Sequence, residues 1–144
     1  MRHNAAVDIS ARTEYAIRAM LALAQAAGTS SGPLSVDSLA TRQGLPRRFL
    51  ESIVSDLRRA GLVVSTRGAQ GGYSLSRPSA EISLGDVFRG VDGPLAEHLP
   101  TVWVAVRASL RQVLDETSLA DVLSGDLPDR VVELSSAPDA WRNR

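Results

Sequence analysis

Residues 46–60 carry side chains whose types and spacing suit contacts with nucleic acid. Arg48, Glu51, Ser52, Ser55 and Arg59 recur at spacings of three and four residues, which places them on one face of a helix. Arginine binds phosphate oxygens and guanine edges, and carboxylate and hydroxyl groups exchange hydrogen bonds with other base edges. The pattern therefore predicts a helix that reads bases in a major groove.

A glycine-rich turn follows this helix, in the sequence RGAQGGY at residues 67–73. Glycine adopts backbone angles that other residues avoid, so three glycines within five residues predict a tight turn. Residues 62–65 and 73–76 read as short strands on either side of it. Together they predict a β-hairpin at residues 62–77 with Arg67 and Gly68 at its tip, which is the layout of a winged helix.

The formal net charge of +0 hides an uneven distribution of charge. Residues 42–77 carry seven arginines against two acids, a net charge of +5, and residues 78–144 carry six arginines against eleven acids, a net charge of −5. The positive charge lies on the predicted helix and hairpin, where it can meet a polyanion. Arg47 adds to it at the start of the helix. We expect the contacts with nucleic acid to be made by Arg47, Arg48, Phe49, Glu51, Ser52, Ser55, Arg59, Arg67 and Gly68.

Capping residues divide the rest of the first 92 residues into helices. Ser10 and Ser35 are candidate N-caps, and Gly28 and Gly44 candidate stops. Pro46 suits the first turn of the reading helix. Two helices joined at Gly44 form a helix-turn-helix unit. The predicted buried stripe of the second helix consists of Phe49, Leu50, Ile53, Val54 and Leu57.

Residues 101–117 are predicted to form a long helix with an apolar seam. Trp103, Val106, Leu110 and Val113 recur in steps of three and four residues, and Leu114 widens the seam. Such a helix either closes the core of its own domain or pairs with a second copy, and the prevalence of symmetric dimers favours pairing. The sequences SLGD at 83–86 and SLAD at 118–121 resemble capping boxes at the starts of two shorter helices.

The predicted fold class is mainly α with a small β-hairpin. A winged helix-turn-helix domain spans residues 8–92, and a dimerisation helix with a short following helix spans 101–125. We expect the acidic, proline-containing tail at 126–144 to be flexible, with Trp141 the one residue suggesting that it docks. No apolar run approaches the roughly 20 residues of a membrane span, and no signal peptide is evident, so we expect a cytoplasmic protein.

The chain resembles the Rrf2-type winged-helix transcription regulators over roughly residues 8–125. The motifs that carry the resemblance are EYAIRAM at 14–20, FLE at 49–51, LRRAGLV at 57–63, RG at 67–68 with GGY at 71–73, and SLAD at 118–121. The resemblance implies a homodimer paired through residues 101–117, with Glu51 and its neighbours reading bases and Arg67 entering the minor groove.

The chain departs from cluster-bearing members of that group. They carry cysteines in a loop before the dimer helix, whereas residues 94–100 of this chain contain none. Glu14 stands where some relatives place a carboxylate ligand, and His98 lies in the loop. One carboxylate and one imidazole cannot hold an iron–sulfur cluster, which needs mostly thiolates. We therefore predict no cofactor and no metal site. Pro46 stands where relatives often have a capping serine.

These features bear on three classes of function. The first is a sequence-specific regulator that binds double-stranded DNA, and we expect a homodimeric repressor on a near-palindromic operator. Its signal is a small molecule, a partner protein or nothing beyond its own concentration, and the sequence does not identify which. The second is a winged-helix module that binds proteins, but such a face needs apolar anchors rather than arginines. The third is an enzyme. It lacks support because the chain has no cysteine and two histidines, and no P-loop lysine follows the glycines.

Overall fold

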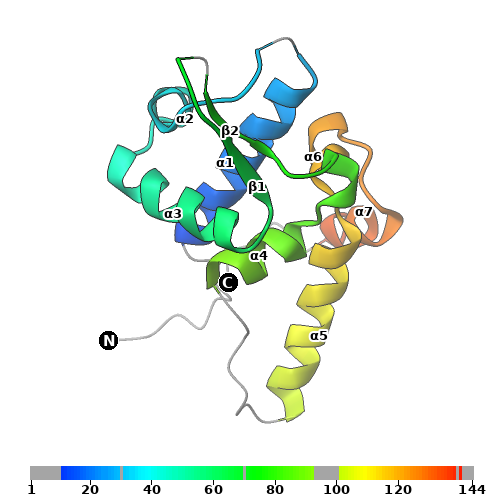
Figure 1. Ribbon diagram of the computed structural model, residues 1–144. Helices are drawn as coiled ribbons and strands as arrows, with labels where there is room; N and C mark the ends of the chain where they lie inside the picture. Colours follow the sequence, from blue (N-terminus) through cyan, green and yellow to red (C-terminus); the bar gives the residue numbers. More distant parts are fainter. Residues whose placement is uncertain (1–10, 30, 70, 93–100, 139, 141–144) are drawn as a thin grey trace.

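The computed structural model describes residues 11–29, 31–69, 71–92, 101–138 and 140, and for residues 92, 101–104 and 107 it describes the backbone alone. The described part is mostly helical and has one two-stranded antiparallel sheet, as the sequence predicts (Figure 1). Its elements in chain order are α1 (Ala11–Ala27), α2 (Val36–Gln43), α3 (Arg47–Arg59), β1 (Val63–Thr66), β2 (Gly72–Leu75), a 3-10 turn (Ser79–Glu81), α4 (Leu84–Asp92), α5 (Thr101–Glu116), α6 (Leu119–Ser124) and α7 (Asp129–Ser135).

Helix α1 is the centre of the core. It contacts α2, α3, α4, α6 and β2, and its Ala16, Ala19 and Met20 are fully buried. The small alanines bring neighbouring helices close to α1, and the larger Met20 and Leu23 fill the space between them. The predicted cap of α1, Ser10, lies outside the described residues.

The helix-turn-helix forms where the sequence predicts it. The Ser35 hydroxyl accepts a hydrogen bond from the backbone N–H of Ser38 and caps α2. Gly44 ends α2 in the left-handed conformation, at φ 63°. Helix α3 then begins at Arg47, with Pro46 as its N-cap. Pro46 has extended angles and lies outside the first turn, and its carbonyl oxygen accepts from Leu50 N–H.

The hairpin pairs Val63 with Leu75 and Thr66 with Gly72, one residue away from the predicted strand limits. Leu34, just before α2, exchanges two backbone hydrogen bonds with Tyr73, at 2.9 and 2.7 Å. The backbone of Gly72 approaches Leu34 so closely that a Cβ atom would lie 2.5 Å from the Leu34 carbonyl carbon and oxygen. The wing is therefore tied to the start of the helix-turn-helix.

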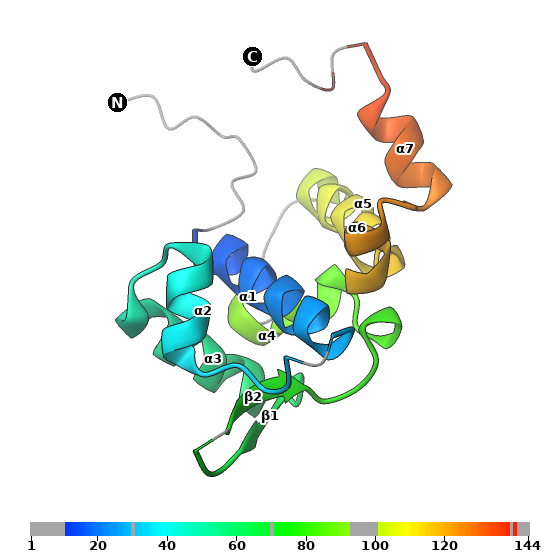
Figure 2. The ribbon, with the colours of Figure 1, turned by 90° about the horizontal axis from the view of Figure 1, so that it is seen from above.

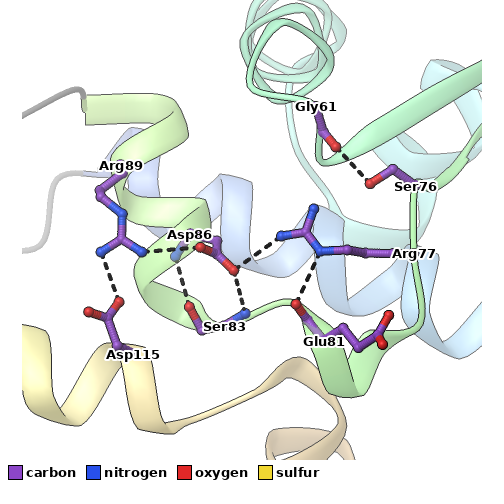
Figure 3. A network of polar contacts seen from close by, with 8 residues as sticks. All are labelled: Gly61, Ser76, Arg77, Glu81, Ser83, Asp86, Arg89 and Asp115. Carbon is purple, nitrogen blue, oxygen red and sulfur yellow. Dashed lines mark hydrogen bonds and ion pairs between the residues drawn. The ribbon is translucent and has the colours of Figure 1, made fainter.

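A polar network joins the end of the wing to α4 and α5 (Figure 3). Arg77 and Arg89 both donate to Asp86, at 3.3 and 3.1 Å, and Arg89 also donates to Asp115 at 2.8 Å. We call these four residues the junction. Gly85 leaves room for it, because a Cβ atom there would overlap Asp115 Oδ1.

Both predicted capping boxes are present. Ser83 and Asp86 exchange side-chain and backbone hydrogen bonds of 3.0 Å at the start of α4, and Ser118 and Asp121 do the same at the start of α6. Backbone hydrogen bonds also join the segments that precede the two helices. Leu84 N–H donates to Thr117 O, and Leu119 N–H donates to Ile82 O. This pairing fixes the end of α5 against the start of α4.

Helix α5 projects from the body, and its C-terminal half lies beside α4 and α6 (Figure 1). Helix α7, which no pattern in the sequence predicts, forms within the tail expected to be flexible. It lies far from the tip of the wing (Figure 2). Arg130 of α7 attaches it to α5 by donating to Gln112 at 3.0 Å and by pairing with Glu116 at 3.7 Å. In the part of the chain that the structure describes, we find no helical segment with the length and apolar character of a membrane span.

Candidate nucleic-acid interface

Helix α3 is held by one apolar stripe and leaves the opposite face open. Leu50, Ile53, Val54 and Leu57 are at most 1% exposed and pack into the core. Arg48, Ser52, Ser55 and Arg59 follow one another at intervals of four, three and four residues, and all four are exposed. We call this row, together with Glu51 and with Arg67 of the wing, the reading surface.

Arginines on and beside the reading surface differ in their partners. Arg47 pairs with Asp37 of α2 at 3.2 Å and with Glu51 at 3.1 Å, and Arg59 pairs with Asp56 at 3.3 Å. Arg48 and Arg67 are exposed and have no carboxylate partner within the described part of the chain. A guanidinium without a carboxylate is free to bind phosphate or a base edge.

The prediction that Phe49 belongs to the buried stripe is wrong. The side chain is 53% exposed, because it lies at the edge of the stripe, where the Tyr15 ring of α1 covers only one side of it. The two ring centroids are 6.4 Å apart and the ring planes meet at 77°, an edge-to-face contact. Exposure is compatible with the other prediction for Phe49, that it contacts DNA.

The tip of the wing projects beyond the body of the molecule (Figure 2). Arg67 and Gly68 lie there, and both are exposed. Gly68 has a φ of 110°, which L side chains rarely adopt, and a Cβ atom added to it would have no heavy atom within 4 Å. The glycine is therefore required by the turn, and it leaves the backbone at the tip open to a ligand.

Two residues that no sequence motif marks, Arg12 and Asp56, belong to this region. Arg12 of α1 donates to Ser52 Oγ at 3.0 Å and forms an ion pair with Asp56. Residues 12 and 56 lie 44 positions apart, so no local pattern in the sequence could reveal the contact. Arg58 is also exposed and has no carboxylate partner among the described residues.

The predicted dimerisation residues lie on α5 and are only partly covered. Val106, Leu110, Val113 and Leu114 have intermediate exposure in the single chain. The side chain of Trp103 lies outside the described residues, as does the loop at 94–100 with His98. The seam is therefore neither fully buried in its own domain nor fully exposed.

A helix-turn-helix, an exposed polar row on its second helix and a basic wing define a winged-helix DNA-binding protein. The chain also matches the sequence profile of the Rrf2 family, described as iron-dependent transcriptional regulator, over residues 9–125. It belongs to the Rrf2 family, whose members are transcriptional regulators rather than enzymes, and it is a DNA-binding regulator.

Curated relatives support this assignment. The chain is 47% identical over 143 residues to Rv1287 of Mycobacterium tuberculosis (strain H37Rv), a candidate HTH-type transcriptional regulator, with 88% of each chain covered. It is 38% identical over 127 residues to the HTH-type transcriptional regulator CymR of Bacillus subtilis, covering 82% of this chain and 91% of CymR.

Solved structures give the same fold. The structure of IscR from T. potens matches with a TM-score of 0.73 at 42% identity, covering 83% of this chain and 88% of that one. The structure of B. subtilis CymR, described as the global cysteine regulator of that organism, matches with a TM-score of 0.73 at 37% identity, covering 83% and 98%.

The family description mentions iron, and the residues of this chain do not fit an iron–sulfur cluster. Such clusters are held mostly by cysteine thiolates, and the sequence contains no cysteine. In the part that the structure describes, no three or more histidine, aspartate or glutamate side chains group so that they could hold a metal ion. The chain therefore fits the subgroup that lacks cluster cysteines.

Proposed function

We propose that this regulator is a homodimeric repressor that binds a near-palindromic operator. Helix α3 of each protomer enters a major groove, and the wing places Arg67 in the adjacent minor groove, whose narrow form carries a strong negative potential. The observation that carries the proposal is that Arg48 and Arg67 are exposed and lack a carboxylate partner among the described residues. A protein acting on chromosomal promoters would be cytoplasmic.

The residues of the reading surface and three of their neighbours have distinct roles in this proposal. Arg48 and Arg59 bind phosphates or guanine, and Glu51 accepts from cytosine. Ser52 and Ser55 bind base edges, and Phe49 supplies an apolar contact for a thymine methyl group. Arg47 contributes less than Arg48, because DNA must compete with Asp37 and Glu51 for it. Gly68 lets the backbone at the tip of the wing approach the sugar–phosphate chain.

The experiment for DNA binding is selection of sites from random duplex DNA by the purified protein, followed by binding measurements at several salt concentrations. We expect an enriched motif with two related halves, centred one helical turn apart, roughly 34–36 Å. Transcription in vitro from a promoter that overlaps the motif should fall when the protein is added. If no motif were enriched, sequence-specific DNA binding would be contradicted. If transcription rose, only the repressor role would be contradicted, and DNA binding would stand.

Dimerisation is tested separately on α5. The half-buried seam of Val106, Leu110, Val113 and Leu114 supports pairing of two copies through this helix. We expect light scattering to give twice the mass of one chain, and Leu110→Asp to give a folded monomer. The matched control is Ser109→Asp, because Ser109 is the exposed neighbour of Leu110 and should remain dimeric. A monomeric wild type would remove this part of the proposal.

A further inference from the structure

Helix α1 contacts the reading helix at two successive points. Tyr15 packs edge to face on Phe49, and Arg12 reaches Ser52 and Asp56. Arg12 and Tyr15 are three residues apart, so they share one face of α1. Phe49, Ser52 and Asp56 are three and four residues apart and form one line along α3. The contacts are thus in register along both helices.

The contact at Arg12 determines what Ser52 can offer to a base. A serine hydroxyl has one proton to donate and lone pairs to accept with. Arg12 Nη2 donates to Ser52 Oγ at 3.0 Å, so the hydroxyl proton must point elsewhere. Within the described residues Ser52 donates that proton to no acceptor. Accepting from Arg12 occupies one of the two lone pairs of Oγ, so the contact biases Ser52 toward offering its proton to the groove as a hydrogen-bond donor.

The same guanidinium compensates the negative charge of Asp56 by forming an ion pair with it. This carboxylate lies on the side of α3 that borders the reading surface, where an unpaired negative charge would repel phosphate. Arg12 pairs with one of its oxygens and Arg59 with the other. When Arg59, whose side chain is 77% exposed, turns to DNA, Asp56 keeps Arg12 as its partner. Arg59 is thus released without leaving an isolated charge.

We propose that Arg12 is a positioning residue for sequence discrimination, which orients Ser52 to donate to a base-edge acceptor such as guanine O6 or N7, adenine N7 or thymine O4. The inference rests on the proposed DNA-binding role of α3. It gives α1 a part in base reading although Arg12 itself contacts no base. A residue that only stabilised the fold would leave the selected motif unchanged.

The test compares motifs selected from random duplex DNA by the wild type, Ser52→Ala, Arg12→Gln and the double variant. Ser52→Ala identifies the base position that Ser52 reads. We expect Arg12→Gln to weaken preference at that same position by about two- to tenfold, the factor for one hydrogen bond. The double variant should be no weaker there than Ser52→Ala. The matched control is Arg18→Gln, on the same helix, because Arg18 pairs only with Glu14 among the described residues.

Further measurements separate the alternatives. If Arg12 bound phosphate directly, its removal would lower the salt slope by about 0.9 on every sequence, whereas a positioning role leaves the slope unchanged. If Arg12→Gln does not fold, Asp56→Ala removes the anchor of Arg12 from the other side and should weaken the same position. The inference is overturned if Ser52→Ala changes the base preference at no position of the motif. It is also overturned if the folded variants at Arg12 and Asp56 keep the wild-type preference at the position that Ser52 reads. If the wild type selects no motif, both the proposed DNA-binding function and the inference about Arg12 fail.

Discussion

The reading surface and the junction both contain arginine side chains, but these arginines have different partners. At the junction, Arg77 and Arg89 both bind Asp86, and Arg89 also binds Asp115. On the reading surface, Arg48 and Arg67 bind no carboxylate among the described residues. Arginines at the junction connect the wing, α4 and α5 through charges of the chain itself. Arg48 and Arg67 leave their charge available to a ligand.

The difference changes how the charge count of the sequence is understood. The seven arginines of residues 42–77 include Arg77, which belongs to the junction, and Arg47 and Arg59, which are paired with acids. The electrostatic attraction for DNA therefore comes from fewer arginines than the sequence suggests. Variants at the two regions should separate binding from stability.

The largest effect is expected for the double variant Arg48→Ala/Arg67→Ala. Removing two unpaired guanidinium groups should weaken binding to the selected site about 10- to 100-fold, or roughly 1.4–2.8 kcal/mol. The slope of log K against log salt should become shallower by about 0.9 for each phosphate that is no longer neutralised. Fluorescence anisotropy with labelled duplex at several salt concentrations measures both quantities.

The control for that variant removes the same amount of charge elsewhere. Arg18 and Arg130 are exposed arginines whose partners lie on α1 and α5, away from the wing. Arg18→Ala/Arg130→Ala should keep affinity and salt slope close to those of the wild type. Equal losses in the two double variants would mean that overall charge, rather than the reading surface, governs binding.

Glu51→Ala should change which sequence is bound more than how tightly DNA is bound. A carboxylate accepts from cytosine but repels phosphate, and Glu51 also holds Arg47 at 3.1 Å. Its removal should reduce the preference for one base pair about three- to tenfold, while affinity for random DNA stays equal or rises. The measurement is a competition between the selected duplex and variants at each position. An unchanged preference at every position would exclude Glu51 from base reading.

The local elements are largely predictable from the sequence because their determinants are local. Serine caps, the glycine stop of α2, the glycines of the wing and the apolar stripe of α3 all act over a few residues. The wrong prediction for Phe49 has a related cause. Its position borders the stripe, and only the placement of Tyr15 decides that the ring lies at the surface.

Pairings between distant residues cannot be predicted in this way. Nothing in the local sequence distinguishes Arg77 or Arg89 from Arg48, and their different roles depend on which carboxylates the fold brings near them. Arg12 with Asp56 and Arg89 with Asp115 are such pairs. Helix α7 escapes prediction because it is short and is attached to α5 through the contacts of Arg130.

Arg89→Ala tests the junction. Unlike the variants of the reading surface, it should lower the stability of the protein and leave DNA affinity nearly unchanged. The variant loses two ion pairs of a side chain that is about half exposed, so unfolding by urea should show a loss of about 1 kcal/mol. DNA affinity of the folded protein should stay within about twofold of the wild type. If binding fell as far as in the reading-surface variant, the junction would transmit its state to α3 and would be more than a structural connection.

The smallest effect is expected in how Asp86 changes the stability of the protein with pH. Burial alone would raise the pKa of this carboxyl, but hydrogen bonds from the Ser83 backbone and the Arg89 side chain outweigh it, and the pKa lies below its ordinary value of 3.8. A carboxyl with a lowered pKa in the folded state stabilises the protein above its unfolded pKa, and this contribution is lost as pH falls through the folded value. Asp86→Asn should therefore be less stable than the wild type near pH 6, and the difference should shrink below about pH 4. Urea unfolding between about pH 6 and pH 2.5 measures this, and a difference that stays constant over the range would mean that the charge of Asp86 does not stabilise the junction.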